Sequence, residues 1–457
     1  MTAVIESDTT ATDSGVYAEV DAAVRRARRA QAAFRDWKEE RVDALLQDLA
    51  EAFAGEAALF AEATVRETGL GNVTDKTLKN RFASLTVYEA LAGKIGRGPI
   101  SVNTESRVTE VASPVGVVFG VVPVTNPVET AIFKTLIALK ARNALILSFH
   151  HQSLRVGQMV AGLIQHGLAA HGAPLDLVQV PSRAGRETTS LFMHHPGVSL
   201  ILATGGSGLV KAAYSSGKPA IGVGPGNAPA WIAADANLEW AAQSVVWSKS
   251  FDNGLICGAE HSLVVDARVA ASFAAALERR GAAMLTPQER DQFVRCAIDS
   301  DTGSLRRNLI GQSASAIADA VGISRSHAVE LLVVSAHIGR LDAFATGEKL
   351  APVLSMFQVN GDDEALALCE SLLDTVGAGH TAIVHTADQA RIERFARTMP
   401  VGRILVNTPG AQGCCGMTTG LECSMTLGCG TFGGNSTTDN VTFRHLMNIK
   451  RIAYNLD

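Results

Sequence analysis

Hydrophobic side chains recur at helical spacing near the start of the chain. A first helix is predicted from Val16 to about Trp37. Its apolar positions are Val20, Val24, Ala27 and Phe34. The same kind of spacing predicts one second helix over residues 40–68. Residues 98–114 differ, because β-branched residues stand there between Gly, Pro, Asn and Ser, which predicts strands joined by turns.

From residue 115 onward, apolar strand-like runs alternate with helical runs. The first series of strands is predicted at residues 115–124, 144–149, 175–180 and 198–204. The helical runs of this series are residues 126–141, 154–172 and 208–217. A second series of strands is predicted at residues 261–266, 329–335, 381–386 and 402–407. This alternation predicts parallel sheets covered by helices, and therefore an α/β protein with two α/β domains in series.

Composition and charge narrow the classes of partner. The chain has 457 residues, 47% of them hydrophobic and 19% charged, enough to bury a large core in two large domains. Its formal net charge of -5 implies no strong field toward nucleic acid or anionic membrane. The basic run RRARR at residues 25–29 lies in the first helix, where a solvated face is favoured over a nucleic-acid patch. We expect neither nucleic acid nor membrane as a partner.

The beginning of the chain and the cysteines indicate a compartment. The first fifteen residues, MTAVIESDTTATDSG, are polar and mildly acidic, which argues against a secretory signal. No uncharged apolar run is long enough to cross a bilayer. The seven cysteines are thinly spread, which is typical of reduced thiols rather than a disulfide framework. We predict a soluble, cytoplasmic protein.

Asn126 follows an apolar strand and precedes Pro127, with Glu129 in the next turn. Asparagine at the N-cap, proline at the first helical position and an acid in the first turn make a good helix start. In the alternative interpretation, the Asn126 amide donates a hydrogen bond to a developing oxyanion. The two interpretations compete for one side chain.

Two glycine-rich stretches follow strand-like runs. Gly205, Gly206 and Gly208 leave backbone N–H groups free for phosphate at a helix start, although they do not make the G-x-G-x-x-G fingerprint. Gly222 and Gly224 belong to the stretch AIGVGPGNAP, whose alternating glycines allow a ligand or another segment to approach the backbone. An irregular loop without a ligand has the same appearance.

Cys257 lies in the stretch KSFDNGLICGAEHSLVVD, residues 249–266. A free cysteine is commonly a small buried side chain. The preceding Asp-Asn-Gly, however, has the chemistry of a turn that presents a thiol at a domain edge. Both interpretations, core residue and nucleophile, stay open on spacing alone.

Other clusters of potential metal ligands carry no predicted site. Cys414, Cys415, Cys423 and Cys429 contain no C-x-x-C pair, which argues against zinc. His150 and His151 follow a strand, where neighbouring side chains point to opposite faces, so one metal held by both is not expected. No metal site is predicted.

Taken together, five stretches resemble the aldehyde dehydrogenase superfamily and, within it, the CoA-acylating branch that forms acyl-CoA from acetaldehyde, propionaldehyde or succinate semialdehyde. They are residues 113–148, 203–227, 248–266, EKLAPVL at 348–354 and MTLGCGTFGGNSTTDN at 425–440. They span nearly the whole chain in the order of the family. The resemblance implies an aldehyde dehydrogenase-like α/β fold, with two Rossmann-like domains and a small β oligomerisation arm.

The resemblance also assigns roles to single residues. Cys257 matches the nucleophile of the family and Asn126 matches the amide of the oxyanion hole. The positions that match cofactor-binding residues are Thr125, Ser148, His150, Thr204, Gly205, Gly206, Ser207, Gly222, Gly224 and Glu348, of which Glu348 matches the acid that contacts the nicotinamide ribose. The implied cofactor is NAD or NADP, and coenzyme A is the implied co-substrate.

One departure from the hydrolytic members of the family concerns the reaction. Those enzymes carry a Glu-Leu-Gly-Gly motif whose glutamate activates water, whereas the similar position here is at or near Gly222. General-base catalysis contributes about 10²–10⁴-fold. A thiol acceptor needs less help, because a few per cent is thiolate at neutral pH. The sequence therefore predicts a Cys257 thioester that CoA removes, reversibly, to give a short-chain acyl-CoA.

A second departure concerns the nucleotide. Hydrolytic members usually have Lys-Pro followed by an acid where this chain has Ser148-Phe149-His150-His151. Without an acid to select a free ribose 2′-hydroxyl, NADP is not excluded. The remaining alternatives are a hydrolytic dehydrogenase that uses another base and a non-catalytic assembly or cargo protein. The segment 406–425, which borders the acyl pocket by resemblance, has no Lys or Arg, which favours a short, uncharged aldehyde.

The expected organisation follows from the same resemblance. Residues 1–235 are predicted as the dinucleotide-binding domain, with 96–112 in a β arm, and 236–435 as the catalytic domain. Residues 436–457 are predicted to return to the arm. The family implies a homodimer or a dimer of dimers. Some relatives reside in bacterial microcompartments, usually with an amphipathic N-terminal peptide, and the polar first fourteen residues favour free cytosol.

Overall fold

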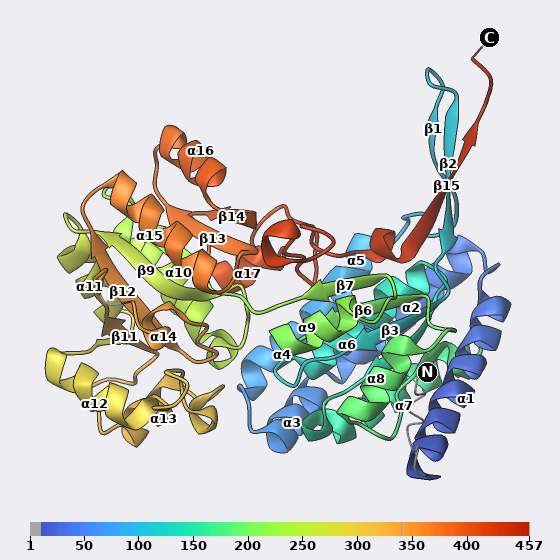
Figure 1. Ribbon diagram of the computed structural model, residues 1–457, viewed down its shortest axis with the longest axis horizontal. Coiled ribbons are helices and arrows are strands. Elements are labelled where there is room, and N and C mark those ends of the chain that lie inside the picture. The colour runs from blue at the N-terminus through green and yellow to red at the C-terminus, as the bar shows by residue number, and fades with distance from the viewer. Residues whose placement is uncertain (1–10, 340, 457) are drawn as a thin grey trace, which may run out of the picture.

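The computed structural model describes residues 11–339 and 341–456 of the chain. It contains two lobes, each built on a parallel sheet, and a projecting three-stranded arm (Figure 1). The predictions for the first ten residues lie outside the described residues. Within the described part, no helix is both long and apolar enough to span a bilayer.

The first lobe is built on a five-stranded parallel sheet. Its order is β5 (Val178–Gln179), β4 (Ala144–Ser148), β3 (Val117–Val121), β6 (Leu200–Thr204) and β7 (Ala220–Val223). The helices of this part of the chain are α1 (Ala11–Phe34), α2 (Glu39–Gly55), α3 (Ala57–Thr68), α4 (Val73–Arg81), α5 (Val87–Leu91), α6 (Pro127–Lys140), α7 (Leu154–Ala170), α8 (Arg186–His194) and α9 (Ser207–Tyr214). Strands buried on both faces have continuous apolar runs, which explains the pattern in the sequence.

The second lobe is built on a seven-stranded parallel sheet. Its order is β10 (Ala282–Met284), β11 (Leu331–Ser335), β12 (Val353–Val359), β9 (Glu260–Asp266), β8 (Ala228–Ile232), β13 (Gly379–His385) and β14 (Val401–Val406). Its helices are α10 (Leu238–Ser250), α11 (Ala270–Glu278), α12 (Pro287–Ala297), α13 (Ala314–Ala320), α14 (Ala343–Thr346), α15 (Asp362–Thr375), α16 (Gln389–Thr398) and α17 (Gly410–Cys414). Strand β8 lies before residue 235, so the change of sheet precedes the predicted end of the first domain.

The arm is antiparallel. It consists of β1 (Gly98–Asn103), β2 (Val108–Pro114) and β15 (Met447–Ala453), with β2 in the middle. Residues from both ends of the chain therefore build one sheet that extends away from the lobes (Figure 1). The predicted β arm and the predicted return of the C-terminal segment correspond to these strands.

One predicted helix is divided. Residues 40–68 form α2 and α3, because the backbone at Glu56 leaves helical geometry at φ −95° and ψ 11°. Gly55 precedes this point, and glycine weakens a helix interior. Both helices keep a buried apolar face, so periodicity alone could not show the break.

Candidate active site

Cys257 lies in the loop between a short 3₁₀ turn, Phe251–Gly254, and β9. Asp252 and Asn253 both have left-handed backbone conformations, with φ of 47° and 53°. Such strain persists only where surrounding contacts fix it, and it is common at functional sites. Here the Asp252 backbone N–H donates to Asp75 Oδ2 at 2.7 Å, and the Asn253 amide donates to the Gly311 carbonyl at 2.8 Å.

The thiol of Cys257 faces a histidine. Its Sγ lies 3.1 Å from Nε2 of His380, whose Nδ1 lies 2.9 Å from the Thr381 hydroxyl. Burial lowers the pKa of His380 to about 3 and raises the pKa of Cys257. The pair at rest is therefore a neutral thiol beside a neutral imidazole. When Nδ1–H donates to Thr381, Nε2 is left as an acceptor for the thiol proton.

His380 was not among the residues expected from the sequence. It stands 123 positions after Cys257 and directly before the apolar run 381–386, so it reads as part of a buried strand. The signal that could have found it is the general one, a lone candidate nucleophile that requires a histidine elsewhere in the chain. Only the fold brings the two together.

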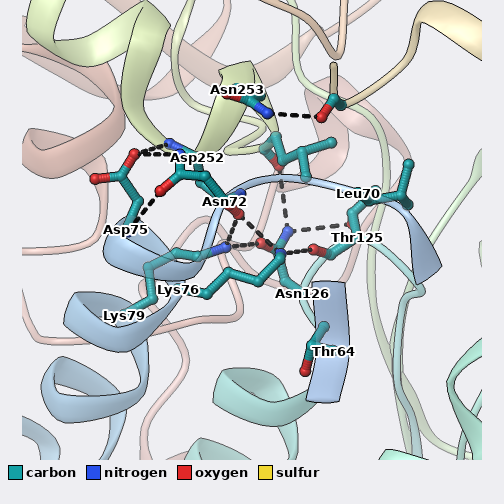
Figure 2. Close-up of polar contacts among 12 residues, drawn as sticks. Thr64, Leu70, Asn72, Asp75, Lys76, Lys79, Thr125, Asn126, Asp252 and Asn253 are labelled. Atoms are coloured by element: carbon teal, nitrogen blue, oxygen red, sulfur yellow. Dashed lines mark hydrogen bonds and ion pairs between the residues drawn. The ribbon is translucent and has the colours of Figure 1, made fainter. Parts of the chain in front are cut away.

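The side chain of Asn126 does not cap α6. Asn126 occupies the N-cap position, but no backbone N–H of the helix donates to it, so the capping interpretation of its side chain is wrong. Its Nδ2 donates to the Leu255 carbonyl at 3.2 Å and to the Thr125 hydroxyl at 3.1 Å (Figure 2). Its Oδ1 accepts from Lys79 at 2.5 Å. The amide nitrogen thus lies against the loop that carries Cys257.

The expected cofactor residues of the first lobe gather at the carboxyl edge of its sheet. Ser148 and Thr204 end β4 and β6, and the turn after Thr204 is held to β7 by the Gly205 N–H, which donates to the Val223 carbonyl at 3.3 Å. The Thr204 hydroxyl is buried without a partner among the described residues. A Cβ added at Gly206 or Gly224 would meet no atom within 4 Å. This edge is where open α/β sheets bind dinucleotides.

Gly222 has no room for a side chain. A Cβ there would lie 2.7 Å from Val210 Cγ1 and 2.8 Å from Tyr214 Cε2. The Gly222 N–H donates to the Tyr214 hydroxyl at 2.9 Å, which fixes the ring in that space. The stretch 220–226 contains no acidic residue. A glutamate that activates water cannot come from this part of the chain.

Glu348 reaches the same region from the second lobe. Its Oε1 accepts from the Gly226 N–H at 3.1 Å, and a Cβ at Gly226 would lie 1.8 Å from the Cys257 carbonyl oxygen. Glu348 therefore lies beside the turn that packs on the Cys257 loop. Burial raises its pKa to about 7, against the opposing effects of the Gly226 N–H and Lys249.

The two histidines after β4 differ from expectation. The rings of His150 and His151 lie 4.1 Å apart, centroid to centroid, at 38° to each other, rather than on opposite faces. The reason is that β4 ends at Ser148 and His151 begins a 3₁₀ turn, so strand alternation does not apply. Burial and His151 lower the pKa of His150. Among the described residues, no three His, Cys, Asp or Glu side chains are grouped as metal ligands.

Comparisons with known proteins agree with this geometry. The model of the aldehyde dehydrogenase family matches residues 6–442. The chain is 38% identical over 441 residues to the bifunctional aldehyde-alcohol dehydrogenase AdhE of Escherichia coli, covering 95% of this chain and 49% of that protein. It thus spans about half the length of the bifunctional relatives it matches.

Solved structures give the same result for the fold. An acetylating aldehyde dehydrogenase from Geobacillus thermoglucosidasius superposes with a TM-score of 0.94 at 40% identity, covering 98% of this chain and 99% of that one. A propionaldehyde dehydrogenase from Rhodopseudomonas palustris, with bound CoA and an acylated cysteine, gives 0.87 at 27% identity, covering 95% and 97%. The predicted fold class is confirmed, and the chain belongs to the aldehyde dehydrogenase family.

Proposed function

We propose that this chain oxidises an aldehyde with NAD(P)⁺ and transfers the acyl group to coenzyme A. The observation that carries the proposal is the Cys257–His380 pair, 3.1 Å apart, beside a glycine stretch that has no acid and, at Gly222, no room for one. The similarity to acetylating enzymes over the full length of a solved chain supports it.

In the acylation step, His380 accepts the thiol proton of Cys257 as the sulfur adds to the aldehyde carbonyl. Because burial lowers the pKa of His380 to about 3, Nε2 is unprotonated at neutral pH and holds the thiol proton only transiently, as the C–S bond forms. The oxyanion that forms takes hydrogen bonds from the Asn126 amide and the Cys257 backbone N–H. Thr204 to Ser207, with Ser148 and Glu348, are the residues that would hold the dinucleotide, which supplies the hydride acceptor when bound.

In the second step, the thiol of CoA replaces Cys257 on the acyl group. Between the two steps His380 releases the Cys257 proton to solvent. It then accepts the CoA proton and returns that proton to the leaving Cys257 sulfur. A thiol is partly ionised near neutral pH, whereas water needs a strong general base to attack a thioester at a useful rate. Exchange of one thioester for another is nearly balanced in free energy, so the reaction runs in both directions.

The deciding experiment is product analysis with and without CoA. The purified protein, an aldehyde and NAD⁺ are expected to give acyl-CoA with CoA, and about one NADH per active site followed by a slow phase without it. Carboxylate formed at full rate without CoA would contradict the proposal and favour a hydrolytic enzyme. Cys257→Ala is expected to abolish both phases, and unchanged activity of this variant would contradict the role of Cys257. No NADH formation by the wild-type protein would favour a non-catalytic protein.

The nucleotide and the aldehyde are finer proposals. No acid stands among residues 148–151 to repel a 2′-phosphate, so we expect values of kcat/KM for NAD⁺ and NADP⁺ within about tenfold of each other. For the aldehyde we propose a short, uncharged chain. A panel of acetaldehyde, propionaldehyde, succinate semialdehyde and sulfoacetaldehyde tests this, and preference for the two anionic aldehydes would contradict it.

The arm supports a proposal about assembly. Among the described residues, no strand pairs with the outer edges of β1 and β15, and Val102 and Ile452 on these strands are 66% and 46% exposed. Unpaired strand edges favour pairing with another chain. We therefore expect a homodimer or a dimer of dimers, which light scattering after size-exclusion chromatography would measure. A monomer at micromolar concentration would contradict this.

A further inference from the structure

Lys79 is a fully buried lysine that no step of the proposed reaction uses. It extends from α4, and its side chain is 1% exposed. Its ammonium contacts Asn126 Oδ1 at 2.5 Å and Asp252 Oδ2 (Figure 2). It also contacts Glu129 Oε1 at 2.5 Å. Two of these partners stand next to the proposed chemistry, because Asn126 carries the oxyanion amide and Asp252 lies in the Cys257 loop.

The contact with Lys79 fixes the orientation of the Asn126 amide. An asparagine amide can rotate to exchange its oxygen and nitrogen, and the two ends bind opposite kinds of partner. An ammonium has only donors, so the end that faces Lys79 must be Oδ1. Nδ2 is thereby directed to the other side, toward the Leu255 carbonyl, two residues before Cys257.

The same contact strengthens the amide as a donor. A positive charge on the oxygen of an amide draws electron density from its nitrogen, and hydrogen bonds in series polarise one another inside a protein. Burial opposes the charge of Lys79, but Asp252 and Glu129 outweigh that effect and raise its pKa. The lysine is therefore charged at every pH at which the enzyme is assayed.

Asp252 joins this arrangement to the nucleophile loop. Its Oδ2 also accepts from Lys76 at 3.0 Å, and its Oδ1 accepts from the Asn72 backbone N–H at 3.0 Å. The residue is one of the two with a left-handed backbone before Cys257. Lys79 and Asp252 thus fix the Asn126 amide and the Cys257 loop in position relative to each other.

We propose that Lys79 is the positioning residue of the oxyanion hole, which sets the rotamer of Asn126 and polarises its amide. The inference rests on the proposed function, because it requires Asn126 to stabilise an oxyanion. It also identifies Asp252 as the residue that fixes the position of the Cys257 loop relative to the Asn126 amide.

A double-mutant cycle tests the proposal. The variants are Lys79→Met, Asn126→Ala and the two combined, with Lys76→Met as the matched control. Lys76 is equally buried on the same helix and contacts the same Asp252 oxygen, but it bonds to the Thr125 carbonyl instead of the Asn126 side chain. The measurements are single-turnover NADH formation, the KM values for aldehyde and CoA, and thermal unfolding.

Removal of one oxyanion-hole donor typically costs about 10²–10³-fold in rate. We expect Asn126→Ala to lose about 10²-fold and Lys79→Met at least tenfold in NADH formation, with KM values little changed. In the Asn126→Ala background, Lys79→Met is expected to change the rate less than threefold. Lys76→Met is expected to lose less than fivefold in either background.

The outcomes separate the two proposals. Full activity of Asn126→Ala would overturn the oxyanion role itself, and with it the proposed mechanism. A slow Asn126→Ala combined with an additive Lys79→Met, or with equal losses for Lys79→Met and Lys76→Met, would overturn only the positioning role. If Lys79→Met does not fold, Lys79→Met/Glu129→Gln, which removes one charge of each sign, takes its place in the cycle.

Discussion

Two clusters of buried lysines flank the Cys257 loop, and they differ in whether carboxylates balance the charge of their ammonium groups. In the first, Lys76 and Lys79 contact the carboxylates of Asp252 and Glu129. In the second, Lys249 donates to the Lys349 carbonyl at 2.7 Å and lies 3.3 Å from His261 Nδ1, and no carboxylate of residues 11–339 or 341–456 contacts it. Both clusters are fully buried, so the difference lies in the partners alone.

The pKa values follow from these partners. Burial lowers the pKa of Lys249 to about 7, and the more distant Glu260 and Glu348 oppose this only in part. For Lys79, the contacting carboxylates outweigh burial and raise the pKa. A buried ammonium keeps its charge only when carboxylates touch it. The Lys79 ammonium is therefore permanently charged, whereas Lys249 titrates near neutral pH. Burial and the neighbouring Lys79 lower the pKa of Lys76, although Asp252 and Glu129 oppose this.

The strongest test of the comparison is to remove the shared carboxylate of the first cluster. Asp252→Asn leaves two buried ammonium groups with Glu129 alone, and we expect it to lower the free energy of unfolding by about 3–5 kcal/mol. Urea denaturation measures this. The control is Glu239→Gln, whose partner Arg279 is 58% exposed, and we expect a cost below about 0.5 kcal/mol. Equal costs for Asp252→Asn and Glu239→Gln would show that the charge of Asp252 does not stabilise the first cluster.

The pH dependence of stability gives the second test, through Glu348, a carboxyl group near the second cluster. Glu348 has a pKa of about 7 in the folded chain and an ordinary value of 4.5, so the folded state binds more protons between these values. Its contribution to stability is complete below pH 4.5 and is lost as the pH rises through 7. Glu348→Gln is therefore expected to gain about 2 kcal/mol relative to wild type between pH 5 and 8.

Denaturation curves at several pH values measure this difference. Glu289→Gln is the control, because its Arg325 partner lowers the pKa of Glu289 to about 2 and moves its titration below this window. A flat difference for Glu348→Gln would contradict the assigned environment of that carboxyl.

The smallest effect compares one substitution in both clusters. At pH 9 the amine of Lys249, with a pKa of about 7, is neutral. Lys249→Met then removes no charge and leaves the Lys349 carbonyl without its donor, which costs about 1–2 kcal/mol. Lys79→Met at the same pH leaves two carboxylates underpaired and is expected to cost about 3 kcal/mol or more. Equal costs would remove the distinction between the clusters.

Much of the fold could be predicted because buried parallel strands leave a local trace in the sequence. The runs at 144–149 and 261–266 became β4 and β9 almost unchanged. The break at Glu56 and the strand β8 could not be found in this way. A glycine in a helical pattern does not show whether the helix continues, and β8 begins inside the glycine-rich stretch AIGVGPGNAP, whose pattern does not predict a strand.

The candidate site was predictable only where chemistry is concentrated in a motif. Cys257 and Glu348 stand in motifs that resemble a family, and their roles stay predictions. His380, Lys76 and Lys79 do not stand in such motifs. A buried lysine in a polar helical stretch such as VTDKTLKNR, residues 73–81, has the pattern of an exposed one. Its carboxylate partner lies 173 residues away, and only packing brings it into contact.

The C-terminal return has a consequence for the integrity of the molecule. The chain crosses from the first lobe to the second between β7 and β8, and it crosses back before β15, with Leu427 packed in the second core and Val441 in the first. Ser436 links the returning C-terminal segment to β7, because its hydroxyl donates to the Ala220 carbonyl at 3.0 Å. Two covalent tethers thus join the lobes. A protease that cuts either one leaves them bound through the other, and a circular permutant opened at one crossing keeps its halves attached.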